Sequence, residues 1–451
     1  MKNFIKAFKT EADWCLLLCF SFFSAISMPI ARIFLGACLL LVLRNCIRGK
    51  QKLYLGLPIK GWFAYILFAF IITLLAVFFI NDPLLNPLRG IKKIDKFIWY
   101  LGIPIVATLV NNKERFVQIL RWYVSGCVIA AILVFVTYTF NAWVMSNIPK
   151  ESYMTNPSLR ETVPLAAQWL YNVTNFLGIY DDIWNKIHMH FYDRPDSFST
   201  AFLLQGTMHE SQRLMVAVPA AFVVLVETCK QKLSHKQIVK HLLALLLISF
   251  ALVFTCKRGP LIVAAIVTLP IAFCYNKRLT ILFVGLLITF LLAIPTARMR
   301  MGDLSSEFTL EKGGRYAMWT QIVPQIHEEH PYGIGFMSLT TEKMRNLCPN
   351  MENLPHSHVH STPLQVFVEF SWVGLFLYML WCVFAIYPAI IYLRRGGGLF
   401  AGIPLVIVLS LFLFGFVEYN LADSEVVLLY SLGMGLCDCM YLKTSFRKQN
   451  S

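Results

Sequence analysis

The chain has 451 residues, of which 57% are hydrophobic and only 14% are charged. A soluble protein carries roughly 25% charged residues, so this composition excludes soluble enzymes and DNA-binding proteins and indicates a polytopic membrane protein. In such a protein the formal net charge of +15 is first an indication of membrane topology, because basic residues gather in cytoplasmic loops. It is not evidence of nucleic-acid binding.

Apolar stretches recur along the whole chain, and a membrane crossing needs about 20 residues as a helix. We expect an all-α fold, a polytopic membrane helical bundle of about 12 transmembrane helices with a large, partly helical loop on the outer side. The predicted helices lie near residues 14–28, 29–44, 62–80, 97–111, 118–141, 212–228, 242–256, 260–275, 279–296, 363–393, 399–417 and 424–441.

The distribution of charge sets the orientation. With a cytoplasmic N-terminus, every inner loop is rich in lysine and arginine and the outer segments hold most of the acids, as expected for an inserted chain. Both termini are predicted to be cytoplasmic. Residues 1–296 then hold helices one to nine and an outer segment near 142–211, residues 297–362 form the large outer loop, and residues 363–451 hold helices ten to twelve and a cytoplasmic tail.

Histidines gather in the large outer loop, where an imidazole is a candidate proton acceptor near neutral pH. His360 lies just before the tenth predicted helix, and Pro363 suits the first turn of that helix. We therefore expect His360 at the outer mouth of the bundle. An alternative is that His356, His358 and His360 chelate zinc if the segment is extended. No partnering cysteine or carboxylate group is evident, so we expect no metal.

Cations on the outer side point to an anionic ligand. Arg315 and Trp319 are one helical turn apart. Lys257 and Arg258 interrupt two apolar stretches at an outer corner, against the usual preference of basic residues for the inner face. The alternative for this pair is that the two side chains extend to lipid headgroups.

Three further positions carry charge where it is costly or unusual. Arg89 belongs to an outer basic stretch that either attracts phosphorylated lipid or forms an interfacial amphipathic segment. Arg213, at the start of the sixth predicted helix, and Glu369, inside the tenth, are expected to face the bundle interior, because charges are costly in lipid.

Three motifs resemble those of the O-antigen ligase and polymerase superfamily, membrane glycosyltransferases of the Gram-negative periplasm. The ligase motif has a histidine and a small polar residue, nine residues, then Gly-x-x-Gly. Here it reads His360-Ser361, nine residues, Ser371-Trp-Val-Gly374, with serine in place of the first glycine. The family's Ser-Arg-Gly corner is similar to Lys257-Arg258-Gly259. Its third motif resembles Gly314-Arg315, Trp319, Pro331, Gly333 and Gly335, with one residue fewer between Pro331 and Gly333.

The resemblance covers about residues 250–380 and implies an O-antigen ligase. Such an enzyme transfers a polysaccharide from undecaprenyl pyrophosphate to a sugar hydroxyl of the lipid A core, at the periplasmic face of the inner membrane. The resemblance implies that His360 acts as the general base and that Arg315 and Arg258 stabilise the departing pyrophosphate. It implies no metal and no cofactor. The remaining candidates are substrate-binding residues, namely Arg213, Lys257, Arg89, Trp319, Glu369 and His358. Membrane lipids are the other expected partner. We expect no binding of nucleic acid.

Other functions stay open at this point. An O-antigen polymerase uses similar lipid-linked donors, but its Arg-x10-Gly motif is not met after Arg160, Arg194 or Arg315. A protein O-oligosaccharyltransferase often carries an extra periplasmic domain that is absent here. A twelve-span transporter or flippase often has repeated halves, and none is evident. We favour the ligase; the oligomeric state is left open.

Overall fold

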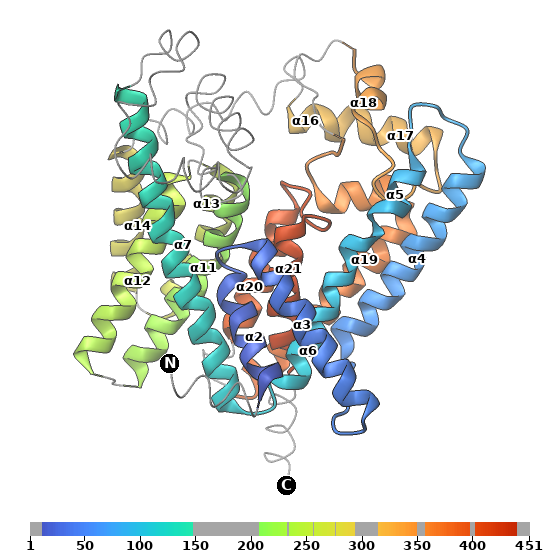
Figure 1. Ribbon diagram of the computed structural model, residues 1–451. Helices are drawn as coiled ribbons and strands as arrows, with labels where there is room; N and C mark the ends of the chain where they lie inside the picture. Colours follow the sequence, from blue (N-terminus) through green and yellow to red (C-terminus); the bar gives the residue numbers. More distant parts are fainter. Residues whose placement is uncertain are drawn as a thin grey trace, which may run out of the picture.

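In the computed structural model, every regular element of the described residues is helical. The structure describes residues 11–147, 207–231, 234–255, 257–275, 277–293, 314–349, 357–396 and 402–439 (Figure 1). Most of the predicted outer segment near 142–211, residues 297–313 of the predicted outer loop, and His356 lie outside these ranges. The all-α fold class is confirmed for the described part.

The first part of the chain builds one side of the bundle. Its helices are α2 (Ala12–Phe23), α3 (Met28–Ile47), α4 (Leu57–Phe79), α5 (Pro87–Lys93), the 3₁₀ helix η1 (Ile94–Leu101), α6 (Gly102–Leu109) and α7 (Lys113–Asn147). A short turn separates α2 from α3 just before Pro29, as the sequence indicated, because proline lacks the N–H that would continue a helix.

The middle of the chain supplies the most deeply buried helix. It contains α11 (Thr207–Lys230), α12 (His235–Phe254), α13 (Arg258–Tyr275) and α14 (Lys277–Ala293). Nearly all of the described side chains of α11 are buried, because α11 packs against α7, α12, α13 and α20 at once.

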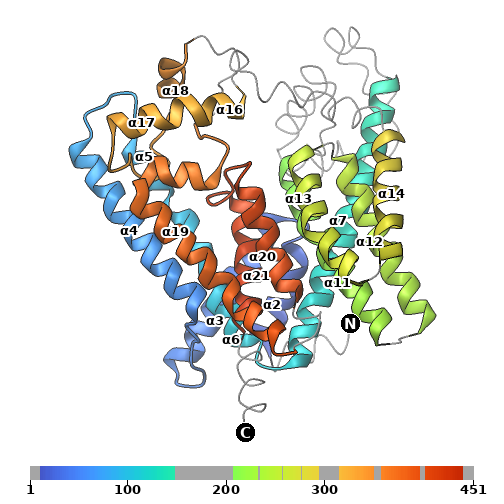
Figure 2. The same cartoon turned by 180° about the vertical axis from the view of Figure 1, so that it is seen from behind.

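The last part of the chain holds short helices and then long ones. The elements are α16 (Arg315–Ala317), the π-helix η4 (Met318–Ile322), α17 (Val323–Glu329), α18 (Thr341–Leu347), α19 (Thr362–Arg394), α20 (Gly402–Gly415) and α21 (Ser424–Cys437). Figures 1 and 2 show α16, α17 and α18 above the upper ends of α4 and α19. We call this upper end of the bundle the site end.

Seven described helices are long and apolar enough to cross a membrane, namely α3, α4, α7, α11, α12, α13 and α19. Three shorter apolar helices, α2, α20 and α21, accompany them. A helix coincides with each predicted stretch, but twelve crossings are not confirmed. The stretch predicted at 97–111 differs most. It divides into η1 and the eight-residue α6, where Pro104 cannot donate a hydrogen bond to the preceding turn.

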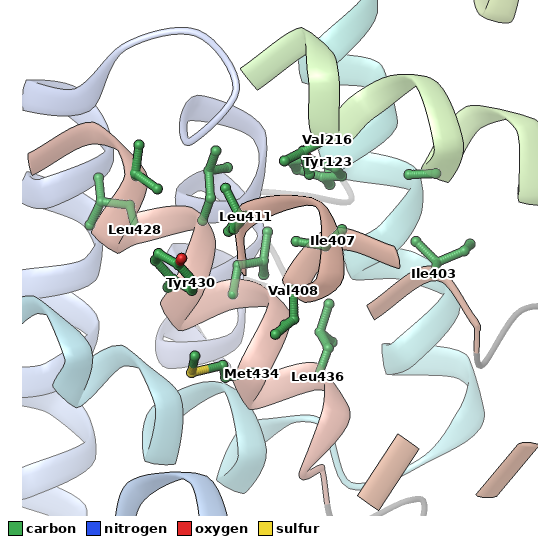
Figure 3. Packing of buried hydrophobic residues seen from close by; sticks show 14 of the residues in the cluster. Tyr123, Val216, Ile403, Ile407, Val408, Leu411, Leu428, Tyr430, Met434 and Leu436 are labelled. Atoms are coloured by element: carbon green, nitrogen blue, oxygen red, sulfur yellow. The ribbon is translucent and has the colours of Figure 1, made fainter. Parts of the chain in front are cut away.

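Two kinds of apolar surface fit a membrane protein. The buried kind lies where α11, α20 and α21 meet, and Figure 3 shows Val216, Ile407, Leu411 and Tyr430 packed there. The exposed kind lies along α4 and α19, whose large apolar side chains, for example that of Phe79 on α4, point outward. Lipid tails can cover such side chains at no cost.

Helix α19 is broken near the site end. Ser371 has φ 59° and ψ −162°, a conformation that is almost exclusive to glycine, so residues 362–370 and 372–394 form two half-helices. The segment after α17 supplies hydrogen bonds at the break: Ile334 N–H donates to Val368 O at 3.2 Å and Gly335 N–H to Glu369 O at 2.9 Å. The Ser371 hydroxyl donates to Pro331 O at 2.6 Å. Serine therefore occupies a conformation here that glycine adopts far more readily.

Candidate active site

Side chains from separate motifs meet at the turn between α20 and α21, residues 416–423, which we call the α20–α21 turn. Its Glu418 carboxylate accepts contacts from three of the predicted residues. Glu418 Oε1 lies 2.7 Å from His360 Nδ1 and 3.5 Å from His358 Nε2. Glu418 Oε2 lies 3.5 Å from Arg315 Nη2. A proton acceptor and a cation are thereby joined by one carboxylate.

The Glu418 carboxylate is buried, with 6% of the residue exposed. Burial alone would raise its pKa, but the side-chain hydrogen bonds and positive charge of His358 and His360 hold the pKa of Glu418 well below its usual range. Glu418 is therefore ionised near neutral pH. The site contains a fixed negative charge that is surrounded by groups able to carry positive charge.

The α20–α21 turn is tied to the first residue of α19. The Thr362 hydroxyl donates to Glu418 O at 3.0 Å and accepts from Asn420 N–H at 3.1 Å. The Asn420 amide in turn donates to Leu411 O in α20 at 2.8 Å. Buried hydrogen bonds of this kind hold a unique geometry because losing a partner is costly, so Glu418 and His360 keep a fixed separation.

The backbone of Val359, between His358 and His360, is clamped on both sides. Trp319 Nε1 donates to Val359 O at 2.8 Å, and Val359 N–H donates to Gln365 Oε1 at 2.9 Å. A second step holds this clamp. Gln365 Nε2 donates to Glu369 Oε1 at 2.9 Å, and the same oxygen accepts Met337 N–H at 2.8 Å.

Backbone conformations that are costly for non-glycine residues cluster here. In the part of the chain that the structure describes, the non-glycine residues with positive φ are Met337, His360 and Ser371. His360 has φ 48° and is preceded by the clamped Val359. Such residues persist where surrounding contacts over-determine them, and they often lie at functional sites.

Lys257 and Arg258 lie, partly buried, where α13 begins. The next residue packs against the same turn, since a Cβ added to Gly259 would lie 3.0 Å from Phe414 and 3.5 Å from Val417. The backbone carbonyl of Val417 also accepts the Arg315 Nε hydrogen bond at 3.0 Å. The Lys-Arg-Gly corner and Arg315 thus approach the same turn from two sides.

The other predicted residues divide into two groups. Trp319 and Glu369 belong to the clamp described above, and Glu369 faces the interior as predicted. Arg213 is buried elsewhere, and its Nη1 donates to Ile26 O at 2.9 Å and to Glu210 Oε1 at 3.3 Å. Arg89 is partly exposed on α5, where the adjacent Gly90 backs closely onto Phe336 O. Substrate binding by these residues stays a prediction.

The ligand atoms of His358, His360 and Glu418 lie within 4.8 Å of one another, which raises the zinc alternative again. Two observations favour a hydrogen-bonded cluster. The 2.7 Å separation of His360 Nδ1 and Glu418 Oε1 is that of a hydrogen bond, and Arg315 supplies a positive charge beside the other oxygen. The contacts of Glu418 are those of a hydrogen-bonded cluster, and the absence of a metal here stays a prediction.

A second polar cluster, of Asp82, Glu329, His330 and Lys343, fastens α17 and α18 to the end of α4. Lys343 Nζ, in a buried side chain, donates to Asp82 Oδ2 at 2.8 Å and also to Glu329 Oε2. The pKa of Asp82, which burial would raise, is lowered by its hydrogen bond from Lys343. His330 directly follows the end of α17, and its Nε2 lies 3.7 Å from Asp82 Oδ2.

The central part of the chain is similar to a known family. Residues 243–379, about a third of the chain, match the family described as O-antigen ligase. The match runs from α12 to the middle of α19 and includes Arg258, Arg315 and His360. No curated protein matches the chain significantly.

The family match ends before the residue on which the cluster depends. Glu418 lies outside residues 243–379, and reasoning from the sequence alone did not single it out. One signal was available, an acidic residue in a short turn between two apolar helices. The partners of Glu418 are remote in the sequence. Helices α19 and α20 separate His360 from Glu418, and Arg315 lies further upstream, so no local spacing connects them.

Proposed function

We propose that the protein is an O-antigen ligase. It transfers a polysaccharide from undecaprenyl pyrophosphate to a sugar hydroxyl of the lipid A core, at the periplasmic face of a Gram-negative inner membrane. The observation that carries the proposal is the meeting of His360 and Arg315 on Glu418 at one end of a membrane bundle. The match of residues 243–379 to the O-antigen ligase family supports it.

In this proposal the transfer is one displacement with inversion at the anomeric carbon. His360 takes the proton of the acceptor hydroxyl, and the hydroxyl oxygen attacks the anomeric carbon of the donor sugar. The bond from that carbon to the phosphate oxygen breaks, and its electron pair leaves with undecaprenyl pyrophosphate. General-base assistance of this kind contributes roughly 10²–10⁴-fold to a rate.

Arg315 and Arg258 neutralise the charge that grows on the departing pyrophosphate. Preformed cations of this kind stabilise a transition state without reorganisation, and the loss of one contributor typically costs about 3–4 kcal/mol. The guanidinium group also suits phosphate, because it can donate two parallel hydrogen bonds. A pyrophosphate leaving group needs no nucleotide, and neither a metal nor a cofactor enters the scheme.

The test is the lipopolysaccharide of a strain that lacks this gene, with and without the gene restored. The proposal expects core-only lipopolysaccharide in the mutant, with polymer accumulating on its lipid carrier, and a full ladder after restoration. Core bearing a single repeat unit would instead show a polymerase. An unchanged ladder would refute both glycosyltransferases and favour a transporter or another glycan pathway.

The residues are tested in the same strain by substitution. We expect His360→Ala, Arg315→Ala and Arg258→Ala to abolish transfer while the protein still inserts. Two substitutions serve as matched controls that should leave transfer unchanged. They are His327→Ala, whose ring packs against Phe367, and Arg345→Ala, exposed on α18. Wild-type transfer from an inserted site variant removes that residue from the mechanism.

A further inference from the structure

We infer that Glu418 is the positioning residue of His360, holding the imidazole so that Nε2 carries the lone pair that accepts the proton. The inference rests on the proposed function in one respect, the role of His360 as base. It assigns a role to a residue that lies outside the family match and that no motif indicates.

The contact of Glu418 is with one particular nitrogen. His360 Nδ1 lies 2.7 Å from Glu418 Oε1, and an ionised carboxylate can only accept hydrogen bonds. Nδ1 must therefore carry the proton. In a neutral imidazole the other nitrogen is then the acceptor, so the carboxylate selects the tautomer in which Nε2 can act as a base. Carboxylate–imidazole pairs in hydrolytic triads work in the same way.

The pair is held by backbone as well as by side chains. Glu418 Oε1 also accepts Tyr419 N–H at 3.2 Å, and Glu418 O accepts the Thr362 hydroxyl. On the opposite side, Val359 is clamped by Trp319 and Gln365. Rotation of the Glu418 side chain would break its bonds to His360 and to Tyr419 N–H, and the clamp on Val359 holds the backbone beside His360 in place.

The charges around the pair support the same role. Among the described residues, His358 and Arg315 also contact the Glu418 carboxylate, and the ring centroid of His358 lies 4.4 Å from that of His360. When the acceptor hydroxyl gives its proton to His360 Nε2, an imidazolium forms beside an ionised Glu418, and this pairing stabilises it. The proton later leaves with the product pyrophosphate or to water, which restores the neutral ring.

The shared carboxylate also relates donor and acceptor sites. Arg315, proposed to face the donor pyrophosphate, contacts Glu418 Oε2, whereas His360 contacts Oε1. One carboxylate thus fixes the cation and the base relative to each other. Well-oriented groups of this kind reduce the cost of bringing two substrates into line.

The experiment compares Glu418→Gln and Glu418→Asp with the control Glu328→Gln, an exposed acid on α17. Transfer is measured on purified protein with a lipid-linked donor and lipid A-core acceptor, from pH 5.5 to pH 9. Glu418→Gln keeps the size of the side chain but removes its charge, so we expect transfer to fall by about 10²-fold or more. The residual activity should persist to lower pH than in the wild type, because the imidazolium of His360 is no longer stabilised by a carboxylate and the ring stays neutral to lower pH. Glu418→Asp should lose less, and the control should match the wild type.

A spectroscopic readout is independent of activity. In protein with ¹⁵N-labelled histidine, the His360 signals are assigned by their loss in His360→Ala. The inference expects the proton on Nδ1 at pH 8 in the wild type, and a shift toward Nε2 in Glu418→Ala. A wild-type proton on Nε2, or wild-type transfer by Glu418→Gln at every pH, overturns the inference.

The two proposals fail in different ways. Wild-type transfer by His360→Ala refutes the base role and with it the proposed mechanism. Loss of transfer in His360→Ala together with wild-type transfer in Glu418→Gln refutes the positioning role alone. A fall in transfer by Glu418→Gln without any change in the pH dependence would indicate a merely structural role and would also overturn the inference.

Discussion

Replacing Gly333 by alanine tests whether the segment after α17 fills the break in α19. Gly333 has φ +94°, and a Cβ there would lie 2.4 Å from Glu369 O and 2.8 Å from Phe370 Cα. Left-handed backbone costs a non-glycine residue about 1–2 kcal/mol. The clash adds to this, since ordinary contact begins at 3.4 Å and the backbone must withdraw by about 1 Å.

The withdrawal stretches two hydrogen bonds, from Ile334 N–H to Val368 O and from Gly335 N–H to Glu369 O. Each contributes about 0.5–1.5 kcal/mol, so the steric part of the effect comes to roughly 1–3 kcal/mol. The total loss for Gly333→Ala is then about 2–5 kcal/mol. Transfer should fall as well, because Glu369 supports the clamp on Val359.

Gly396 provides a matched control within the same protein. It has φ +83°, but nothing lies within 4 Å of its Cβ position, so Gly396→Ala incurs the conformational cost of about 1–2 kcal/mol alone. The assay is thermal unfolding of the detergent-solubilised protein, followed by tryptophan fluorescence. We expect Gly333→Ala to melt several degrees below Gly396→Ala. Equal melting temperatures would show that the segment does not approach the broken helix.

Four further outcomes are expected. The pKa of Glu418 lies below its ordinary value of 4.5, so the stabilisation from its ionised form is complete above that pH and is lost as the pH falls below it. Between pH 5 and pH 3 the melting temperature of the wild type should therefore drop more than that of Glu418→Gln. Trp319→Phe removes one hydrogen bond to Val359, worth about 0.5–1.5 kcal/mol, and should lower transfer by about 2–10-fold with folding intact, whereas an unchanged rate would remove Trp319 from the clamp. Lys343→Met leaves Asp82 without its buried partner and should destabilise the protein by about 1–3 kcal/mol, an effect that adding Asp82→Asn should partly reverse in thermal unfolding. A chelator should leave transfer unchanged; inhibition that zinc restores would instead support a metal at the histidines.

The sequence was sufficient for the class of fold and for the histidines and Arg315 of the cluster. Apolar stretches predicted helices that the structure contains, since a crossing segment must satisfy its own backbone hydrogen bonds. The position of Pro363 correctly placed His360 just before a helix. Arg315 and His360 were expected on the same outer side, and the structure brings both to one carboxylate.

The remaining features depend on contacts between distant segments. The break at Ser371 is invisible in the sequence, because the surrounding residues read as one continuous apolar helix. Glu418 has no local pattern that connects it to His360. Arg213 faces the interior as predicted, but its partners, Ile26 O and Glu210, could not be read from the sequence. Tertiary packing decides such features, and periodicity alone does not report it.

The location of Glu418 has a consequence for biosynthesis. Ribosomes make the chain from its N-terminus, and both histidines and Arg315 enter the membrane assembly before α20 and α21 exist. The α20–α21 turn acquires its shape only when Asn420 bonds to Leu411 in α20 and contacts Tyr430 in α21. A nascent chain that already contains α19 therefore holds the cations and imidazoles without their shared carboxylate. Under the proposed function, an unfinished copy would lack the carboxylate that positions His360 until the last helical pair has been inserted.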